Sequence, residues 1–155
     1  MQYDPSLPWR NLKGEGFNDH IGPVRFARAA DALWQGTLVV DHRHRNSGGV
    51  CHGGVSLTLA DLTMGAASYE AAGSRPCSTI QMDSHFIAAG KEGQRLLAIA
   101  RQLRLVRDLS FMSCEIWALD TPEPGAEGRQ ILRASGIWKY LASRKPGDRG
   151  NPAAG

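Results

Sequence analysis

Residues 46–69 of the chain read NSGGVCHGGVSLTLADLTMGAASY, and this stretch decides the fold. Its first nine residues hold four glycines, at positions 48, 49, 53 and 54. The segment from Val55 to Tyr69 contains one further glycine and no proline. Apolar side chains recur in this segment at intervals of four, three and four residues: Val55, Leu59, Leu62 and Ala66. Because this spacing puts them on one face of an α-helix, the stretch predicts a helix preceded by a glycine-rich loop.

Asp61 is the only charged residue between Gly53 and Tyr69. A lone carboxylate in apolar surroundings costs free energy unless it is paired, solvated or used in chemistry. Asp61 is therefore either a solvent-facing acid or a functional group. The glycines before the helix admit two interpretations as well. They form a flexible turn, or they let a carbonyl oxygen approach the unpaired N–H groups of the helix N-terminus.

The motif Asn46-x-x-Gly49-x-x-His52-Gly53-Gly54, followed by Asp61, resembles the signature of the hotdog-fold acyl-CoA thioesterases. The likeness is to the PaaI-like branch (phenylacetic acid degradation), which includes proteins of the human thioesterase superfamily member 2 type. Residues 79–86, TIQMDSHF, are similar to the strand that follows the central helix in that branch. The resemblance covers residues 23–142. It implies an α+β hotdog fold, in which a curved antiparallel β-sheet wraps a long central helix.

Size and composition are compatible with this fold. The chain has 155 residues, enough for one domain, and 42% of them are apolar. A net charge of +3 and a pI near 9.0 suit a polyanionic ligand such as coenzyme A. Three cysteines without CxxC spacing predict no disulfide framework and a cytoplasmic location. We expect no membrane partner, because no segment approaches a membrane span and the N-terminus does not resemble a signal peptide.

The order of elements also indicates an α+β layer. Residues 1–22 predict a loose arm with one short helix, packed by its aromatic side chains. Two strands follow over 24–29 and 32–42, joined at residues 30–31. The helix ends in the segment 70–76, where Gly73 and Pro76 act as stop signals. Four long strands are expected over 77–88, 95–106, 110–120 and 130–141. The domain is thus placed at 23–142, and the tail 143–155 is expected to be disordered.

A metal site and a nucleic-acid site are both disfavoured. His42, His44, Cys51 and His52 supply zinc-type ligands, but their spacing matches no recurring zinc pattern. We therefore expect no metal and no cofactor. The arginines at positions 43 and 45 are expected on a solvated loop near phosphates or water. Aromatic residues do not interleave with these basic residues, so we expect no nucleic-acid partner.

The resemblance also implies roles for individual residues. Asp61 would act as general base or nucleophile, and the Gly53 N–H would donate to the thioester oxygen. Asn46 would position the water or the carbonyl group, and Thr79 would supply the hydroxyl that helps to hold the water. His52 either polarises the site or serves as a packing and hydrogen-bonding residue.

Three further residues are candidates for substrate binding. Gly54 belongs to the glycine-rich loop. Asp83 and His85 share one face of their strand and are candidates for the rim of the pocket, although alternation toward solvent explains them equally well. Residues 107–110, RDLS, depart from relatives that often carry a glycine before the next strand, so any coenzyme A contact at that turn is open.

Helix geometry predicts a site shared between two chains. Asp61 follows Gly53 by eight residues, which is about 12 Å along the helix axis. A single substrate carbonyl therefore cannot touch both residues of one chain. Two antiparallel helices in a two-fold dimer would bring Asp61 of one chain beside Gly53 of the other, twice. The resemblance implies the same shared site, and also a pairing of dimers into a tetramer.

These observations favour an acyl-CoA thioesterase acting on an acyl- or aryl-acyl-CoA. Two alternatives remain on the same fold: a hotdog enoyl-CoA hydratase and a non-catalytic acyl-CoA-binding protein. Release of free thiol from acyl-CoA separates the thioesterase from the binding protein. Hydration of an enoyl-CoA would identify the hydratase.

Overall fold

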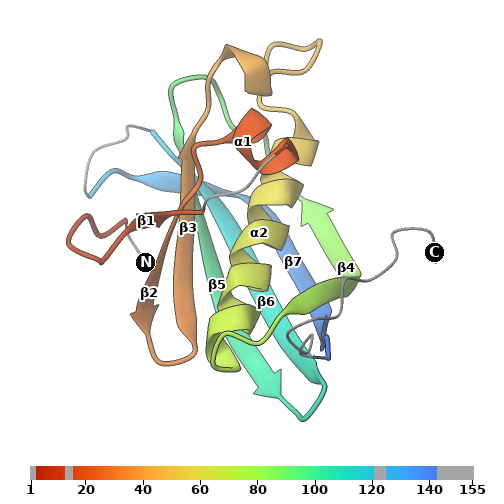
Figure 1. Ribbon diagram of the computed structural model, residues 1–155. Helices are drawn as coiled ribbons and strands as arrows, with labels where there is room; N and C mark the ends of the chain where they lie inside the picture. The colour runs from red at the N-terminus through yellow and green to blue at the C-terminus, as the bar shows by residue number, and fades with distance from the viewer. Residues whose placement is uncertain (1–2, 13–15, 121–124, 143–155) are drawn as a thin grey trace.

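The computed structural model describes residues 3–12, 16–120 and 125–142. One long helix, α2 (Gly53–Ala71), lies on one face of a seven-stranded antiparallel sheet (Figure 1). The strand order is β1-β2-β3-β5-β6-β7-β4, so the two-residue β1 and the ten-residue β4 form the two edges. This arrangement confirms the predicted α+β hotdog fold.

The other helices and strands can be given in chain order. They are β1 (Arg10–Asn11), α1 (Phe17–Ile21), β2 (Arg25–Ala30), β3 (Leu33–Val39), the short 3-10 helix η1 (His42–His44), β4 (Cys77–Phe86), β5 (Arg95–Leu105), β6 (Leu109–Leu119) and β7 (Gly128–Tyr140). The four long strands begin and end within two residues of the predicted bounds. The turn between β2 and β3 lies at residues 31–32, one position later than predicted, and Ala32 has a φ of 54° there. The predicted disordered tail lies outside the described residues.

The four apolar residues that share the predicted helix face are buried to different degrees. Val55 and Leu59 are buried, whereas Leu62 and Ala66 are half-buried. The face that packs on the sheet instead includes Thr63, whose hydroxyl donates to the Leu59 carbonyl oxygen at 2.6 Å. A threonine can enter the core in this way because its polar atom is satisfied within its own helix.

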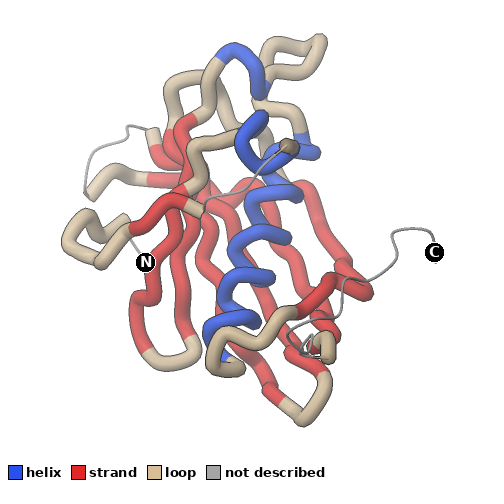
Figure 2. Tube along the Cα trace, viewed as in Figure 1, coloured by secondary structure: helices blue, strands red, loops and turns tan. Residues whose placement is uncertain are grey.

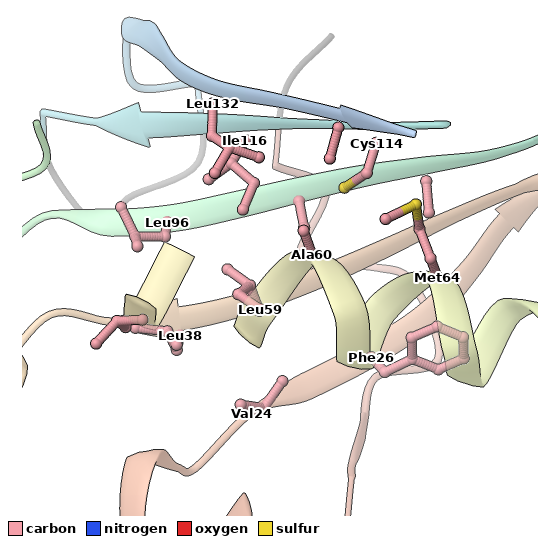
Figure 3. Packing of buried hydrophobic residues seen from close by; sticks show 14 of the residues in the cluster. Val24, Phe26, Leu38, Leu59, Ala60, Met64, Leu96, Cys114, Ile116 and Leu132 are labelled. Carbon is pink, nitrogen blue, oxygen red and sulfur yellow. The ribbon is translucent and has the colours of Figure 1, made fainter. Parts of the chain in front are cut away.

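The core lies between α2 and the sheet. Figure 3 shows Leu59, Ala60 and Met64 of α2 directed toward the strands that carry Ile116 and Leu132. The helix approaches β3 closely at Gly36, where an added Cβ would lie 2.0 Å from the Thr63 hydroxyl oxygen. Glycine at this position therefore sets the distance between α2 and the sheet.

The N-terminal arm covers part of the opposite face of the sheet. Tyr3 packs with Leu97, Ile99 and Leu119 in a second buried cluster, and Trp9 packs against its edge. The expected aromatic packing of the arm is thus confirmed for Trp9. It is wrong for Phe17, whose side chain is 62% exposed.

Helix α1 lies on the same face of the sheet as α2 (Figure 2) and is tied down by η1. Arg43 donates to the carbonyl oxygens of His20 and Gly22 at 3.2 and 3.0 Å. The buried His44 places its Nε2 atom 2.9 Å from the Ile21 carbonyl oxygen. These contacts hold α1 beside the middle of α2. In the part of the chain that the structure describes, no helix is long and apolar enough to cross a membrane.

Candidate active site

A pocket of about 510 Å³ opens between the exposed side of α2 and the first residues of β4. The second half of α2 and the N-terminal segment form most of its wall, and Trp138 of β7 lies among the lining residues. It is lined by Leu12, Asn18, Asp61, Leu62, Gly65, Ala66, Tyr69, Pro76, Cys77, Ser78, Thr79 and Trp138. Leu62 and Ala66, from the predicted apolar face of the helix, are among these lining residues. The lining is predominantly apolar, as is common in small-molecule sites.

Asp61 and Thr79 meet in this pocket. The Thr79 hydroxyl donates a hydrogen bond of 2.7 Å to Oδ1 of Asp61. The turn after α2 reverses the chain, so the start of β4 runs back along the helix and brings the two residues together although they are 18 positions apart. One carboxylate oxygen is thereby oriented by the hydroxyl. The other has no hydrogen-bond partner among the described residues.

The N-terminus of α2 presents a free backbone donor. His52 is the N-cap residue, and its Nδ1 accepts from the Gly54 N–H at 2.9 Å. The Gly53 N–H has no hydrogen-bond partner within the described ranges. An added Cβ at Gly53 would lie 2.9 Å from the ring of Phe86, so a side chain there would have to displace this exposed ring. Gly53 therefore combines an unpaired N–H with the positive end of the helix dipole.

Asn46 shapes the loop in front of the helix. Its side-chain oxygen accepts from the backbone N–H groups of Gly48 and Val50, at 2.9 and 3.3 Å. These bonds fix the turn that leads to Gly53, while the Asn46 side-chain N–H₂ group has no partner in the described part of the chain. That group remains available as a donor.

The structure does not bring all the candidate residues together. Asp83 and His85 point to the face of the sheet away from α2, where they line a separate pocket with Ser113 and Arg133. They do not line the pocket that contains Asp61. Gly53 also lies apart from Asp61 within one chain, about 12 Å along α2.

The cysteine thiols are poorly suited to act as nucleophiles. Burial raises the pKa of Cys77, and the nearby charge of Asp61 raises it further. Burial also raises the pKa of Cys51, and it raises that of Cys114 to about 12. All three thiols are free, so the chain contains no disulfide. A protonated thiol is a weak nucleophile.

The histidines near the helix are held by local hydrogen bonds. Nδ1 of His44 accepts from the Asp41 N–H at 3.0 Å, and Arg43 holds the pKa of Asp41 well below its usual value, at about 2. Cys51 is buried at the β-bridge with Arg45. No group of three or more His, Cys, Asp or Glu side chains in the described ranges is placed to bind a metal ion.

Sequence reasoning missed three residues of the site. Asn18 of α1 lines the pocket beside Asp61, Phe86 lies over Gly53, and Trp138 lies at the bottom of the pocket. Phe86 and Trp138 have the pattern of ordinary strand residues, so nothing in their spacing marks them. Asn18 lies in a short segment whose position depends on the contacts with η1.

Known proteins share both the sequence pattern and the fold. Residues 48–124 match the thioesterase superfamily. Human acyl-coenzyme A thioesterase 13 is 25% identical over 117 residues, covering 76% of this chain and 84% of the human protein. The crystal structure of zebrafish thioesterase superfamily member 2 has a TM-score of 0.70 at 24% identity, and covers 83% of this chain and 88% of the zebrafish chain.

A second similar structure carries a ligand. The Streptococcus mutans protein smu.793, solved bound to acetyl CoA, has a TM-score of 0.61 at 21% identity. The match covers 74% of this chain and 85% of the other. The chain is therefore similar in sequence to the thioesterase superfamily over residues 48–124, and it has the hotdog fold of these solved structures.

Proposed function

We propose that the protein is an acyl-CoA thioesterase, which hydrolyses an acyl- or aryl-acyl-CoA to the free acid and coenzyme A. The observation that carries this proposal is the 2.7 Å hydrogen bond from Thr79 to Asp61 in a mainly apolar pocket. Such a carboxylate can take a proton from water or attack the thioester carbon itself. Acetyl CoA bound to the Streptococcus mutans protein supports the choice of substrate class.

The residues have distinct roles in this proposal. Asp61 is the base or nucleophile, and Thr79 orients it. The Gly53 N–H donates to the thioester oxygen as negative charge develops there. Asn46 shapes the loop and offers its N–H₂ group to the water or the carbonyl, and His52 stabilises the helix start by capping it.

The site would be completed by a second copy of the chain. β4 is an edge strand of ten residues that pairs, among the described strands, with β7 alone, and its Ile80 and Phe86 side chains are more than half exposed. A long edge strand with exposed apolar side chains is a common pairing surface. Antiparallel pairing of two β4 strands would also run the two α2 helices in opposite directions, as the separation of Gly53 and Asp61 requires. Further pairing would give a tetramer, and three free thiols suit a cytoplasmic protein.

The first experiment tests the activity. Purified protein is given a panel of acyl-CoA substrates, and free thiol is followed with a colorimetric reagent. We expect steady release of coenzyme A, and a loss of kcat of about 1,000-fold or more in Asp61→Asn. Asp31→Asn is the matched control, because Asp31 is an exposed turn residue paired with Arg28. Tight acyl-CoA binding without thiol release would indicate the non-catalytic alternative.

A second experiment tests the shared site. Asp61→Ala removes the base, and Gly53→Pro removes the N–H donor, so each homodimer should be nearly inactive. A heterodimer of the two variants contains one site with both intact groups, and should recover up to about half of the wild-type activity. Circular dichroism must show that the proline leaves α2 folded. Verified heterodimers without activity would mean that Asp61 and Gly53 do not meet across the interface.

A further inference from the structure

Trp138 presents an unused hydrogen-bond donor to the candidate active site. Its side chain is 1% exposed, and it lines the same pocket as Asp61 and Thr79. An added Cβ at Gly65 would lie 3.2 Å from its Nε1 atom, so the indole N–H faces the gap left by this glycine. Nε1 has no hydrogen-bond partner among the residues that the structure describes.

Two of the other three tryptophans use their indole N–H groups. The Nε1 atom of Trp34 donates to Glu70 at 2.8 Å, and that of Trp9 donates to the Asp4 carbonyl oxygen at 2.8 Å. The buried Nε1 of Trp117 also lacks a partner, but it belongs to the cluster on the opposite face of the sheet. Trp138 alone of these four places a free N–H in a pocket lined with reactive groups. A donor that lines an apolar pocket costs free energy unless water or a ligand accepts from it.

The Trp138 N–H lies beside Gly65, about one helical turn from Asp61. Gly65 follows Asp61 by four residues, which is one helical turn, or about 6 Å along the axis. The Cys77 thiol lies nearby, but it is turned to the Gly65 carbonyl oxygen at 3.6 Å. If Asp61 acts at the thioester carbon, the indole N–H therefore reaches the acyl group about one helical turn further into the pocket.

We propose that the Trp138 N–H donates a hydrogen bond to an oxygen atom of the acyl group, and that this selects acyl-CoA substrates oxygenated at that depth. The inference rests on the proposed thioesterase function and specifies its substrate class. An apolar acyl group of the same shape would displace water from the indole N–H and leave the donor unpaired. This penalty is expected to lower kcat/KM by about five-fold to about 100-fold.

Matched substrates test the proposal directly. 4-Methoxybenzoyl-CoA and 4-ethylbenzoyl-CoA differ by one oxygen in place of a methylene group. In both the para substituent begins about 6 Å from the carbonyl carbon, as the position of the donor requires. 5-Oxohexanoyl-CoA and 5-methylhexanoyl-CoA form a flexible pair of the same design. We expect the wild-type protein to favour the oxygenated member of at least one pair by about five-fold or more.

Two variants remove the donor in different ways. Trp138→Phe keeps an aromatic ring without the N–H. Gly65→Ala leaves the tryptophan in place but puts a methyl group 3.2 Å from Nε1, and alanine favours the helix. Both should bring the ratio of the two kcat/KM values close to one. The ratio is measured within one protein, so partial loss of folded enzyme cancels. Trp117→Phe, on the opposite face, is the control and should keep the wild-type ratio.

The outcomes separate this inference from the proposed function. Equal hydrolysis of both members by the wild type overturns the inference and leaves the thioesterase function intact. A preference that persists in both Trp138→Phe and Gly65→Ala overturns it as well. If none of the four substrates is hydrolysed, the proposed thioesterase function is refuted for these substrates. Calorimetric binding of the same pairs then tests the role of the Trp138 N–H. Tighter binding of the oxygenated member that is lost in Trp138→Phe supports it, whereas equal or absent binding overturns it.

Discussion

Gly36 controls the distance between α2 and the sheet, and its replacement should disturb both stability and activity. In Gly36→Ala the new Cβ would lie 2.0 Å from the Thr63 hydroxyl oxygen, where ordinary contacts are about 3.5 Å. The helix would have to move about 1.5 Å, or Thr63 would have to leave its rotamer. Overpacking of this kind in a close-packed core costs about 3 kcal/mol of unfolding free energy. Asp61 lies two residues from Thr63, so a shift of α2 would also stretch its 2.7 Å bond with Thr79.

The test is a double-mutant cycle. Thr63→Ala removes the hydroxyl oxygen at 2.0 Å and the methyl carbon at 3.0 Å, and leaves only the Cβ at 3.0 Å. We therefore expect the double variant Gly36→Ala/Thr63→Ala to be within about 1 kcal/mol of Thr63→Ala alone. Thr58→Ala is the matched control, because its hydroxyl donates to the carbonyl four residues before it, as that of Thr63 does, on another face of α2. Urea unfolding, at one protein concentration for all variants, gives the free energies. Strict additivity with Thr63→Ala, or a Gly36→Ala variant as stable as the wild type, would refute this account of the packing.

Three further predictions concern the Thr79 hydroxyl, the Asp41 carboxylate that caps η1, and the reactivity of the cysteine thiols. Thr79→Val should lower kcat by about ten-fold to 100-fold and Thr79→Ser far less, because serine keeps the hydroxyl; equal loss in both variants would contradict this role. Asp41→Asn should cost up to about 1 kcal/mol at pH 7, because asparagine still caps η1 but loses the ion pair with Arg43. The deficit should vanish as pH falls from about 4 to about 2, because Arg43 lowers the folded-state pKa of Asp41 from 3.8 to about 2, and a deficit independent of pH would speak against it. Iodoacetamide should label the half-buried Cys77 before the buried Cys114, as mass spectrometry of the native protein can show.

The sequence predicted the elements better than their faces. The extent of α2 could be predicted because glycines precede it and Gly73 and Pro76 follow it, and each has a direct steric effect. The inward face could not, because hydrophobicity does not show which polar side chains are satisfied locally. The buried Thr63 hydroxyl forms a hydrogen bond within its own helix. The buried Ser68 hydroxyl instead donates to the Ser110 hydroxyl of β6 at 3.1 Å. Leu62 thereby becomes free to line the pocket.

The candidate site was predictable only where a residue type is unusual for its surroundings. Asp61 is such a residue, since a single acid in an apolar helix needs an explanation. Its contact with Thr79 required the turn after α2 and the register of β4, which no local pattern specifies. Trp138 is a typical strand residue by its spacing, and only the missing partner of its N–H sets it apart.

β4 connects both ends of the candidate site. It runs opposite to α2, so its first residues reach Asp61 through Thr79, and its last residue, Phe86, lies against Gly53. The same strand is the edge at which we propose that a second chain pairs. A shift of β4 along its axis would therefore change three things together. It would alter the orientation of the Asp61 carboxylate, the position of Phe86 at the N-terminus of α2, and the register of the proposed pairing with a second chain. Because these three are coupled through one strand, the Asp61 carboxylate and the Gly53 N–H cannot be repositioned independently of each other.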